Sequence, residues 1–223
     1  MSGKEPAWSF SAVKSFEDCP KKHYHLKVAK DYSEPHGEAL FYGNAFHKAA
    51  EDYVGLGVAL PEKFEYAKPA LDALNALEGE KLCEYKMGLT QDLKPCAYFG
   101  RNVWFRGAAD LLIMRGDTAM VIDYKTSKNA RYADKGQLEL MALATFAHFP
   151  KIKKVKGGLL FVVCNAFVKD TYEITDSPQL WEKWLTKYSR LKAAHNNDVW
   201  NAKQNPLCRK HCVVTECIHN GRG

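Results

Sequence analysis

The sequence predicts an α/β domain with a mixed central sheet flanked by helices. Helical patterns occupy the first part of the chain, two apolar strands joined by a tight turn follow at 103–125, and a further helix then leads to more strands. A hairpin followed by a crossover helix and another strand requires antiparallel and parallel neighbours in one sheet. We therefore expect a single mixed sheet with helices packed on it.

The elements were assigned from hydrophobic periodicity and from residues that begin or end them. Ser11 is an expected N-cap, Cys19-Pro20 ends the first helix, and Asp176-Ser177-Pro178 begins the last one. Residues 37–43 are expected to form a loop. The expected helices span 12–18, 44–54, 69–81, 134–149 and 176–195, and the expected strands span 83–89, 103–114, 119–125, 159–164 and 168–174.

Composition narrows the class of protein. The chain has 223 residues, of which 46% are hydrophobic, and carries a formal charge of +6 with a pI near 8.8. This excludes a disordered chain and favours a polyanionic partner. No apolar run approaches the length of a membrane span and no signal-peptide core follows Met1, so we expect a cytoplasmic protein with no membrane partner. Seven cysteines without a secretion signal point to metal or cluster ligation rather than disulfides.

The hairpin carries the most informative pattern. A two-residue loop at Gly116-Asp117 would place Asp110 directly opposite Asp123, and Lys125 would point to the same face. Two opposed carboxylates repel each other unless a proton or a cation lies between them. With the ammonium beside them they could hold a hard divalent cation and use it on phosphate. The plain alternative is a solvated strand edge, because a single Asp-x-Lys is common.

Four motifs in order then resemble a known family. They are Gly43-Asn44-Ala45-Phe46-His47, Gly107-Ala108-Ala109-Asp110, Asp123-Tyr124-Lys125-Thr126 and Gln137-Leu138-Glu139-Leu140. Together they resemble the RecB-like branch of the PD-(D/E)xK nuclease superfamily, which includes CRISPR-associated and phage exonucleases. The resemblance covers roughly 9–137 and returns at the C-terminal cysteines. It implies a restriction-endonuclease-like core.

The resemblance also implies roles for the hairpin residues. Asp110 and Asp123 would bind Mg²⁺ or Mn²⁺, and the backbone carbonyl of Tyr124 would complete the shell. Lys125 would lie beside the attacking water and the scissile phosphate, where it offsets developing negative charge.

Three residues outside the hairpin have implied roles and plain alternatives. His47 would add an imidazole ligand, which favours Mn²⁺, although a histidine at the edge of an apolar helix face is more often structural. Glu84 is a possible further acidic ligand. Gln137 would position the nucleophile or the DNA backbone, or would simply begin a helix. The family usually has tyrosine four residues after this glutamine, and here that residue is Met141.

Four cysteines resemble the ligands of the [4Fe-4S] cluster found in CRISPR-associated exonucleases and related helicase–nucleases. One lies near the start of the chain and three near its end, namely Cys19, Cys208, Cys212 and Cys217. Their late spacing departs from the family's usual C-x-x-C. A structural zinc site is the main alternative, with all four thiolates as ligands or with three thiolates and the imidazole of His211 or His219.

The expected organisation is a single nuclease domain over 1–223. Its core would span about 37–195, and segments 9–36 and 196–223 would form a small helical lobe that binds the cluster or metal. The expected function is a metal-dependent exonuclease that hydrolyses phosphodiester bonds from DNA ends in recombination, repair or replication.

The expected partner is DNA, either single-stranded or at duplex ends. No Gly-x-x-x-x-Gly-Lys motif is present, so unwinding would come from a helicase or recombination partner. Two alternatives remain at this point: a structure-specific endonuclease and a non-catalytic DNA-binding adaptor of the same fold.

Overall fold

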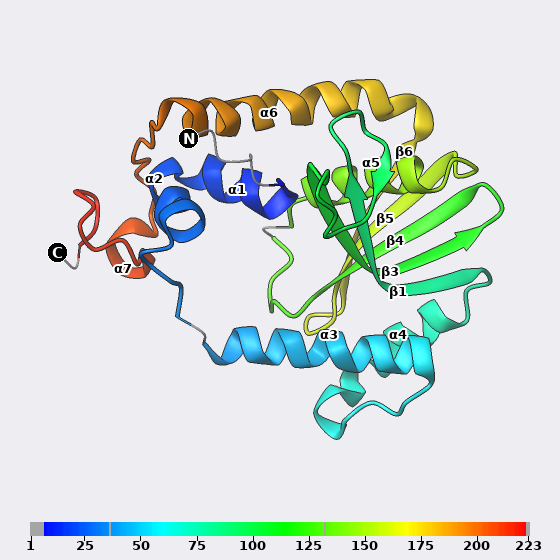
Figure 1. Cartoon of the computed structure of the whole chain (residues 1–223). Helices are drawn as coiled ribbons and strands as arrows, with labels where there is room; N and C mark the ends of the chain where they lie inside the picture. The colour runs from blue at the N-terminus through cyan, green and yellow to red at the C-terminus, as the bar shows by residue number, and fades with distance from the viewer. Residues whose placement is uncertain (1–6, 36, 132, 222–223) are drawn as a thin grey trace. The chain divides into compact units, whose positions relative to one another are not determined.

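The computed structural model describes residues 7–35, 37–131 and 133–221 (Figure 1). The chain divides into two compact units. The first is built on Gly37–Leu180, and the second combines Trp8–His36 with Trp181–Gly223. Segments 9–36 and 196–223 therefore both fall in the second unit. None of the helices in the described ranges combines the length and apolar composition needed to cross a bilayer.

A six-stranded mixed sheet forms the centre of the first unit (Figure 1). The strand order is β2-β1-β3-β4-β5-β6; β4 and β5 are parallel, and every other neighbouring pair is antiparallel. This confirms the predicted α/β class with a mixed sheet. The strands are β1 Glu80–Leu89, β2 Pro95–Cys96, β3 Phe105–Arg115, β4 Thr118–Lys125, β5 Lys154–Phe161 and β6 Ala166–Glu173.

Helix α5 (Gly136–His148) is the crossover between the parallel strands; most of its residues are apolar, and eight of the thirteen are buried. Two glycines let it lie close to the sheet. A Cβ atom on Gly107 of β3 would collide with the Met141 side chain, and one on Gly157 of β5 would lie 3.0 Å from Leu138 Cβ. Close packing of α5 therefore depends on the missing side chain at Gly157, whereas at Gly107 the end of the Met141 side chain would have to move.

Helices α3 (Glu38–Leu56) and α4 (Lys68–Asn75) pack on the other face of the sheet. Phe46 of α3 and Leu71 of α4 are fully buried with Leu111 of β3 and Ile122 of β4. A 3-10 segment, Glu62–Ala67, joins the two helices and adds Phe64 to this cluster. The N-terminal helix of the unit is thus tied to the strands that carry the acidic residues.

Several details of the first unit differ from the sequence prediction; among the strands, β5 begins at Lys154 and not at 159. The expected loop at 37–43 is wrong, because α3 already begins at Glu38 and Gly43 lies inside it. The expected helix at 69–81 ends at Asn75, and β1 begins at Glu80 after a turn at Gly79, whose φ of 133° suits only glycine. Strand β2 was not predicted, because two residues carry no periodicity.

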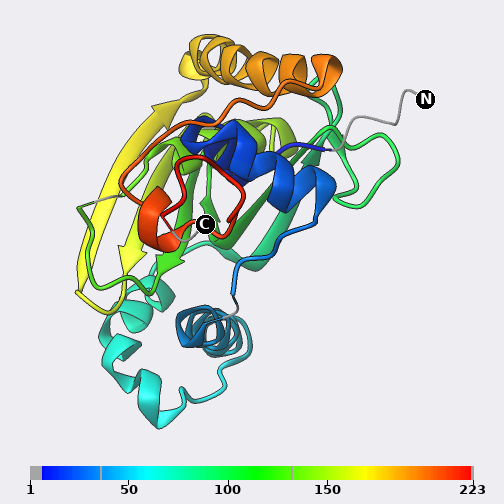
Figure 2. The same cartoon turned by 90° about the vertical axis from the view of Figure 1, so that its left-hand side faces the viewer.

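The second unit contains α1 (Phe10–Asp18), α2 (Pro20–His23), a π-helical turn (Tyr24–Ala29) and α7 (Cys208–His211), and it includes α6 (Ser177–Asn197) from Trp181 onward (Figure 2). The predicted N-cap at Ser11 is wrong: the Ser9 hydroxyl accepts the Ala12 N–H, so the helix begins two residues earlier.

Aromatic packing and one ion pair join α6 to the N-terminal segment within this second unit. The buried Trp8 ring stacks on Tyr188 of α6 with centroids 4.9 Å apart, and Phe10 meets Trp184 edge-on. Lys187 Nζ lies 2.7 Å from a Glu17 carboxylate oxygen. The two ends of the chain therefore build one packed body between them.

Candidate functional site

The ladder between β1 and β3 is broken at one residue of each strand. Cys83 pairs with Leu111 and Tyr85 with Ala109, but Glu84, between them, has a left-handed backbone with φ of 49°. Cys83 and Leu111 pack with α3, whereas the Tyr85 ring lies against the C-terminal end of α5. The alternation of side chains is therefore reversed across Glu84.

This break was missing from the sequence prediction, which assumed regular alternation. Residues with a left-handed backbone conformation are usually glycine or asparagine, so a glutamate in the sequence does not indicate one. The consequence is that Glu84 and the neighbouring Asp110 can both turn toward α3, although the strands continue past them in regular register.

The β3–β4 hairpin has the predicted two-residue loop. Its pairs run from Arg115↔Thr118 to Leu111↔Ile122, so that Asp110 and Asp123 are the next positions in the register. At this point a side chain replaces the backbone ladder, because Asp110 Oδ2 accepts the Tyr124 N–H at 2.5 Å. The hairpin and its register were thus predictable from the turn, and the side-chain bond was not.

Three side chains from three elements converge on the α3 side of the break. His47 Nδ1 on α3 lies 3.2 Å from Asp110 Oδ1 and 4.0 Å from Glu84 Oε1. One ligand atom from each residue falls within 4.8 Å of the others, and all three side chains are half-buried. This is the one group in the described ranges that could hold a metal ion.

A second group lies beside this break, on the α5 side of the sheet. Lys125 Nζ lies 2.6 Å from Asp123 Oδ2 and donates a hydrogen bond of 3.0 Å to Gln137 Oε1. The Gln137 amide nitrogen in turn donates to Asp123 Oδ1. Gln137 begins α5, so the crossover helix holds the lysine and the aspartate in fixed positions.

Burial and crowding of negative charge shift the titration of this site. Burial, reinforced by the nearby Asp110 carboxylate, raises the pKa of Asp123 to about 6 in spite of Lys125. Burial and Asp110 also raise the pKa of Glu84. The hydrogen bond to Asp110 raises the pKa of His47, because it favours the protonated ring. Each raised pKa favours a bound proton, which reduces the net negative charge of the site. A divalent cation bound there would reduce that charge in the same way.

These residues fit a divalent cation. Carboxylate oxygens are the ligands that Mg²⁺ takes in proteins, and an imidazole added to them suits Mn²⁺. His47, Glu84 and Asp110 offer such a set, and Asp123 contributes a further carboxylate nearby. The Tyr124 carbonyl remains a predicted ligand.

Comparison with known proteins agrees with this arrangement. The PD-(D/E)XK nuclease superfamily matches residues 7–217 of the sequence. The chain belongs to this superfamily. Its nucleic-acid substrate follows from that membership, and the acidic group described above lies where the predicted motifs of such a nuclease meet.

Two solved structures share the fold of this nuclease. The protein SSO0001 has a TM-score of 0.50 at 15% identity, with 98% of this chain and 88% of that chain covered. A protein of Eubacterium rectale, named as a candidate exonuclease, has a TM-score of 0.55 at 12% identity, with 91% and 85% covered. At these identities the likeness concerns the fold. Among curated proteins the sequence has no significant match.

The four predicted cluster cysteines of the nuclease all lie in the second unit. Lys203 N donates to Cys19 Sγ at 3.5 Å, and Lys203 O lies 4.0 Å from Cys208 Sγ, so these two sulfurs flank one residue. Within the described ranges the cysteines do not form a compact ligand set for a single ion. The iron–sulfur cluster therefore stays a prediction.

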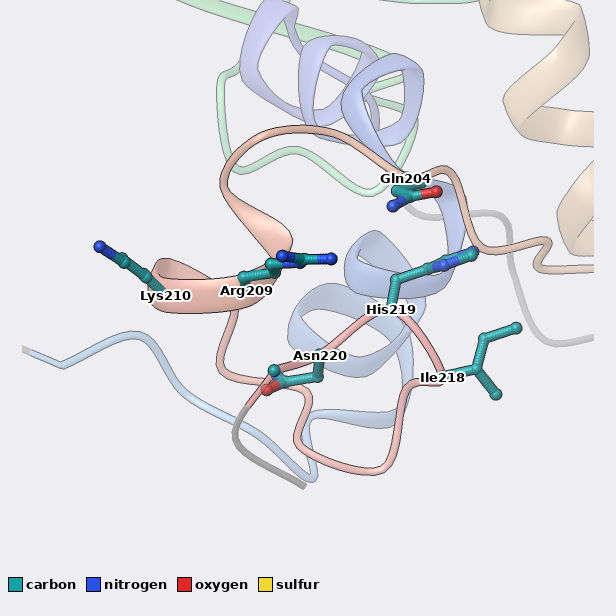
Figure 3. A pocket seen from close by; sticks show the side chains of 7 residues that line it. Gln204, Arg209, Lys210, Ile218, His219 and Asn220 are labelled. Atoms are coloured by element: carbon teal, nitrogen blue, oxygen red, sulfur yellow. The ribbon is translucent and has the colours of Figure 1, made fainter.

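A hollow of about 520 Å³ also lies in the second unit (Figure 3). Arg209 and Gln204 reach toward it, while the Lys210 side chain points away (Figure 3). Asn220 holds its rim by donating to the carbonyls of Cys212 and Val214. The residues that line it include no carboxylate; they are Gln204, Arg209, Lys210, Ile218, His219, Asn220 and Gly221.

Metal affinity is expected to rise with pH through about 6. Metal binding requires the ionised Asp123 and the neutral His47, and the raised pKa values of both groups keep protons on them at lower pH. Calorimetric titration with Mn²⁺ at pH 5 and pH 7.5 should show at least about tenfold tighter binding at the higher pH, with proton release at the lower one. Equal affinity at both values would contradict this assignment. Asp123→Asn should flatten the dependence.

Substitution of Glu84 is expected to separate stability from metal binding. Glu84→Gly removes the cost of a left-handed non-glycine residue, and Glu84→Ala retains that cost. In metal-free buffer the glycine variant should be more stable to urea than the alanine variant by about 1 kcal/mol. Both variants should bind Mn²⁺ more weakly than the wild type. Equal stability of the two would show that the backbone at this position is not strained.

Proposed function

We propose that the chain is a Mg²⁺- or Mn²⁺-dependent deoxyribonuclease of the RecB-like branch, which removes nucleotides from DNA ends. Membership of the nuclease superfamily supports hydrolysis of phosphodiester bonds. The observation that carries the proposal is the meeting of the His47–Glu84–Asp110 group with the Asp123–Lys125–Gln137 group at the break in the sheet. The name of the Eubacterium rectale relative, a candidate exonuclease, favours action at ends.

The residues of the site would have different roles in hydrolysis. A divalent cation held by His47, Glu84, Asp110 and Asp123 would lower the pKa of a water molecule and polarise a phosphoryl oxygen. The Lys125 ammonium would lie beside the scissile phosphate and offset the negative charge that develops during in-line attack. Gln137 would keep Lys125 oriented, because it already accepts a hydrogen bond from that ammonium.

The expected metal ligands and the lysine are all present in this chain, although Met141 replaces the family's usual tyrosine, and this argues against a non-catalytic adaptor. The charged pair Lys125–Asp123 is costly to hold where only 8% of the aspartate side chain is exposed. Binding of DNA alone does not require a lysine whose position is fixed by a glutamine, as Gln137 fixes Lys125.

We also propose that Cys19, Cys208, Cys212 and Cys217 bind a structural [4Fe-4S] cluster in the second unit. The Cys19 sulfur accepts N–H groups from Lys22 and Lys203, and the Cys208 sulfur accepts one from Asn205 at 3.3 Å. Hydrogen bonds of this kind favour thiolates and tune iron–sulfur sites. In such a cluster each thiolate binds a different iron atom, so the sulfurs lie farther apart than the ligands of one ion.

The test of catalysis is digestion of linear DNA labelled at either end, with Mg²⁺ or Mn²⁺, by the wild type and Lys125→Ala. The variant should lose at least about 100-fold in rate, because it lacks the charge that stabilises the transition state. The exposed Lys128, changed to alanine, is the matched control and should retain activity.

Three outcomes would contradict the proposal in different ways. Equal activity of wild type and Lys125→Ala would mean that the site is elsewhere. Cutting of circular single strands would show an endonuclease. Wild-type protein that binds DNA and metal without hydrolysis would be an adaptor.

The test of the cysteine site is anaerobic purification of the wild type, Cys19→Ser and Cys164→Ser. The wild type should be brown, with absorbance near about 400 nm and bound iron. Cys19→Ser should lose both signals, and Cys164→Ser should keep them because Cys164 is exposed and lies in the first unit. Colourless wild-type protein with one zinc per chain would contradict the cluster.

A further inference from the structure

The loop between β2 and β3 presents an exposed phenyl ring. Phe99 is 76% exposed, the highest fraction among the aromatic side chains in the described ranges. It lies in the first unit, like the acidic site. A single exposed aromatic residue needs no explanation in itself. Three further observations distinguish this one.

First, the backbone that carries the ring is held in place. Arg106 Nε donates to the Tyr98 carbonyl at 2.8 Å, and Gly100 N donates to the Ala97 carbonyl at 2.8 Å. The loop lies directly on β1 at Gly88, where an added Cβ would come within 2.9 Å of the Cys96 carbonyl oxygen and 3.1 Å of Tyr98 Cα. Phe99 is therefore exposed on a fixed support, braced edge-on by the Tyr98 ring at 4.9 Å.

Second, two cations lie against the ring. The Arg106 guanidinium is 5.6 Å from the Phe99 centroid and 5.5 Å from that of Tyr98, and Lys86 Nζ is 5.8 Å from Phe99. Neither cation forms an ion pair with any described carboxylate, so both can meet an incoming anion. An aromatic face beside unpaired cations suits a base and its phosphate.

Third, these residues share the face of the sheet that carries the acidic site. The printed register pairs Lys86 with Ala108 and Gly88 with Arg106. Between them, Met87 and Gly107 point the other way, toward Thr145 and Met141 of α5. Lys86, Ala108 and Arg106 therefore face away from α5, as Glu84 and Asp110 do where they meet His47.

The separation along the strand matches a short stretch of nucleic acid. Arg106 precedes Asp110 by four residues of β3, which is about 13 Å at 3.3 Å per residue. A stacked strand covers this length in about four nucleotides and an extended strand in fewer. Lys86 lies between the two ends, because it pairs with Ala108.

We propose that Phe99 is a stacking platform for an unpaired base of single-stranded DNA whose backbone runs along Lys86 and Arg106 to the acidic site. This inference rests on the proposed nuclease function and adds its substrate class. A paired base offers its faces only to its neighbours in the stack, so the platform would select an unpaired end over an intact duplex.

The test measures binding separately from hydrolysis. Fluorescence anisotropy in EDTA gives the Kd for a labelled single-stranded oligonucleotide and for the corresponding blunt duplex. Phe99→Ala should weaken single-strand binding about 5- to 100-fold, and Phe99→Trp should restore it, because stacking needs only an aromatic face. Duplex binding should change little.

Lys86→Ala should also reduce the salt dependence of single-strand binding, because one phosphate contact is lost.

The matched control is Phe167→Ala, which truncates another exposed phenylalanine of the same unit, on the strand at the opposite edge of the sheet. It should bind single strands like the wild type. Unchanged single-strand binding by Phe99→Ala, equal losses for single strands and duplex, or no single-strand binding by the wild type would each overturn the platform. These readouts need no turnover, so a failure of hydrolysis alone would count against the nuclease proposal and not against this one.

Discussion

The structure of the first unit depends on carboxylates held together at a break between strands. Asp110, Asp123 and Glu84 come from three strands, and the Asp110 carboxylate lies close enough to raise the pKa of both Glu84 and Asp123, while burial removes the water that would screen them. Such an arrangement is unstable without compensation. His47, Lys125 and the Tyr124 N–H supply part of that compensation, and the proposed divalent cation would supply the rest.

The helices on the two faces of the sheet make this concentration of charge possible. Helix α3 brings His47 to Glu84 and Asp110, and α5 brings Gln137 to Asp123 and Lys125. Both helices are anchored by apolar contacts. Phe46 of α3 is buried on one face of the sheet, and α5 packs against Gly107 and Gly157 on the other. The energy of hydrophobic burial on both faces therefore holds polar groups in positions that they would not take by themselves.

The same sheet face links the proposed chemistry with the proposed substrate. β3 carries Asp110 at one point and Arg106 four residues earlier, and the register with β1 sets Lys86 between them. A backbone that ran along this strip would meet cations before it met carboxylates. Charges of opposite sign four residues apart on one strand would orient a single-stranded nucleic acid along it.

Much of this protein could be predicted from local sequence, because local rules govern hairpins and helix starts. The Gly116-Asp117 turn determined the register that opposes Asp110 and Asp123, and the apolar run after Gln137 determined the crossover helix. Four features were decided only in the tertiary structure. They are the left-handed backbone of Glu84, the helical conformation of 38–43, the packing of the Phe99 loop on Gly88 and the position of Cys19 near Cys208. Each of these depends on contact between segments far apart in the chain, and periodicity within one segment carries no information about which distant segment it will meet.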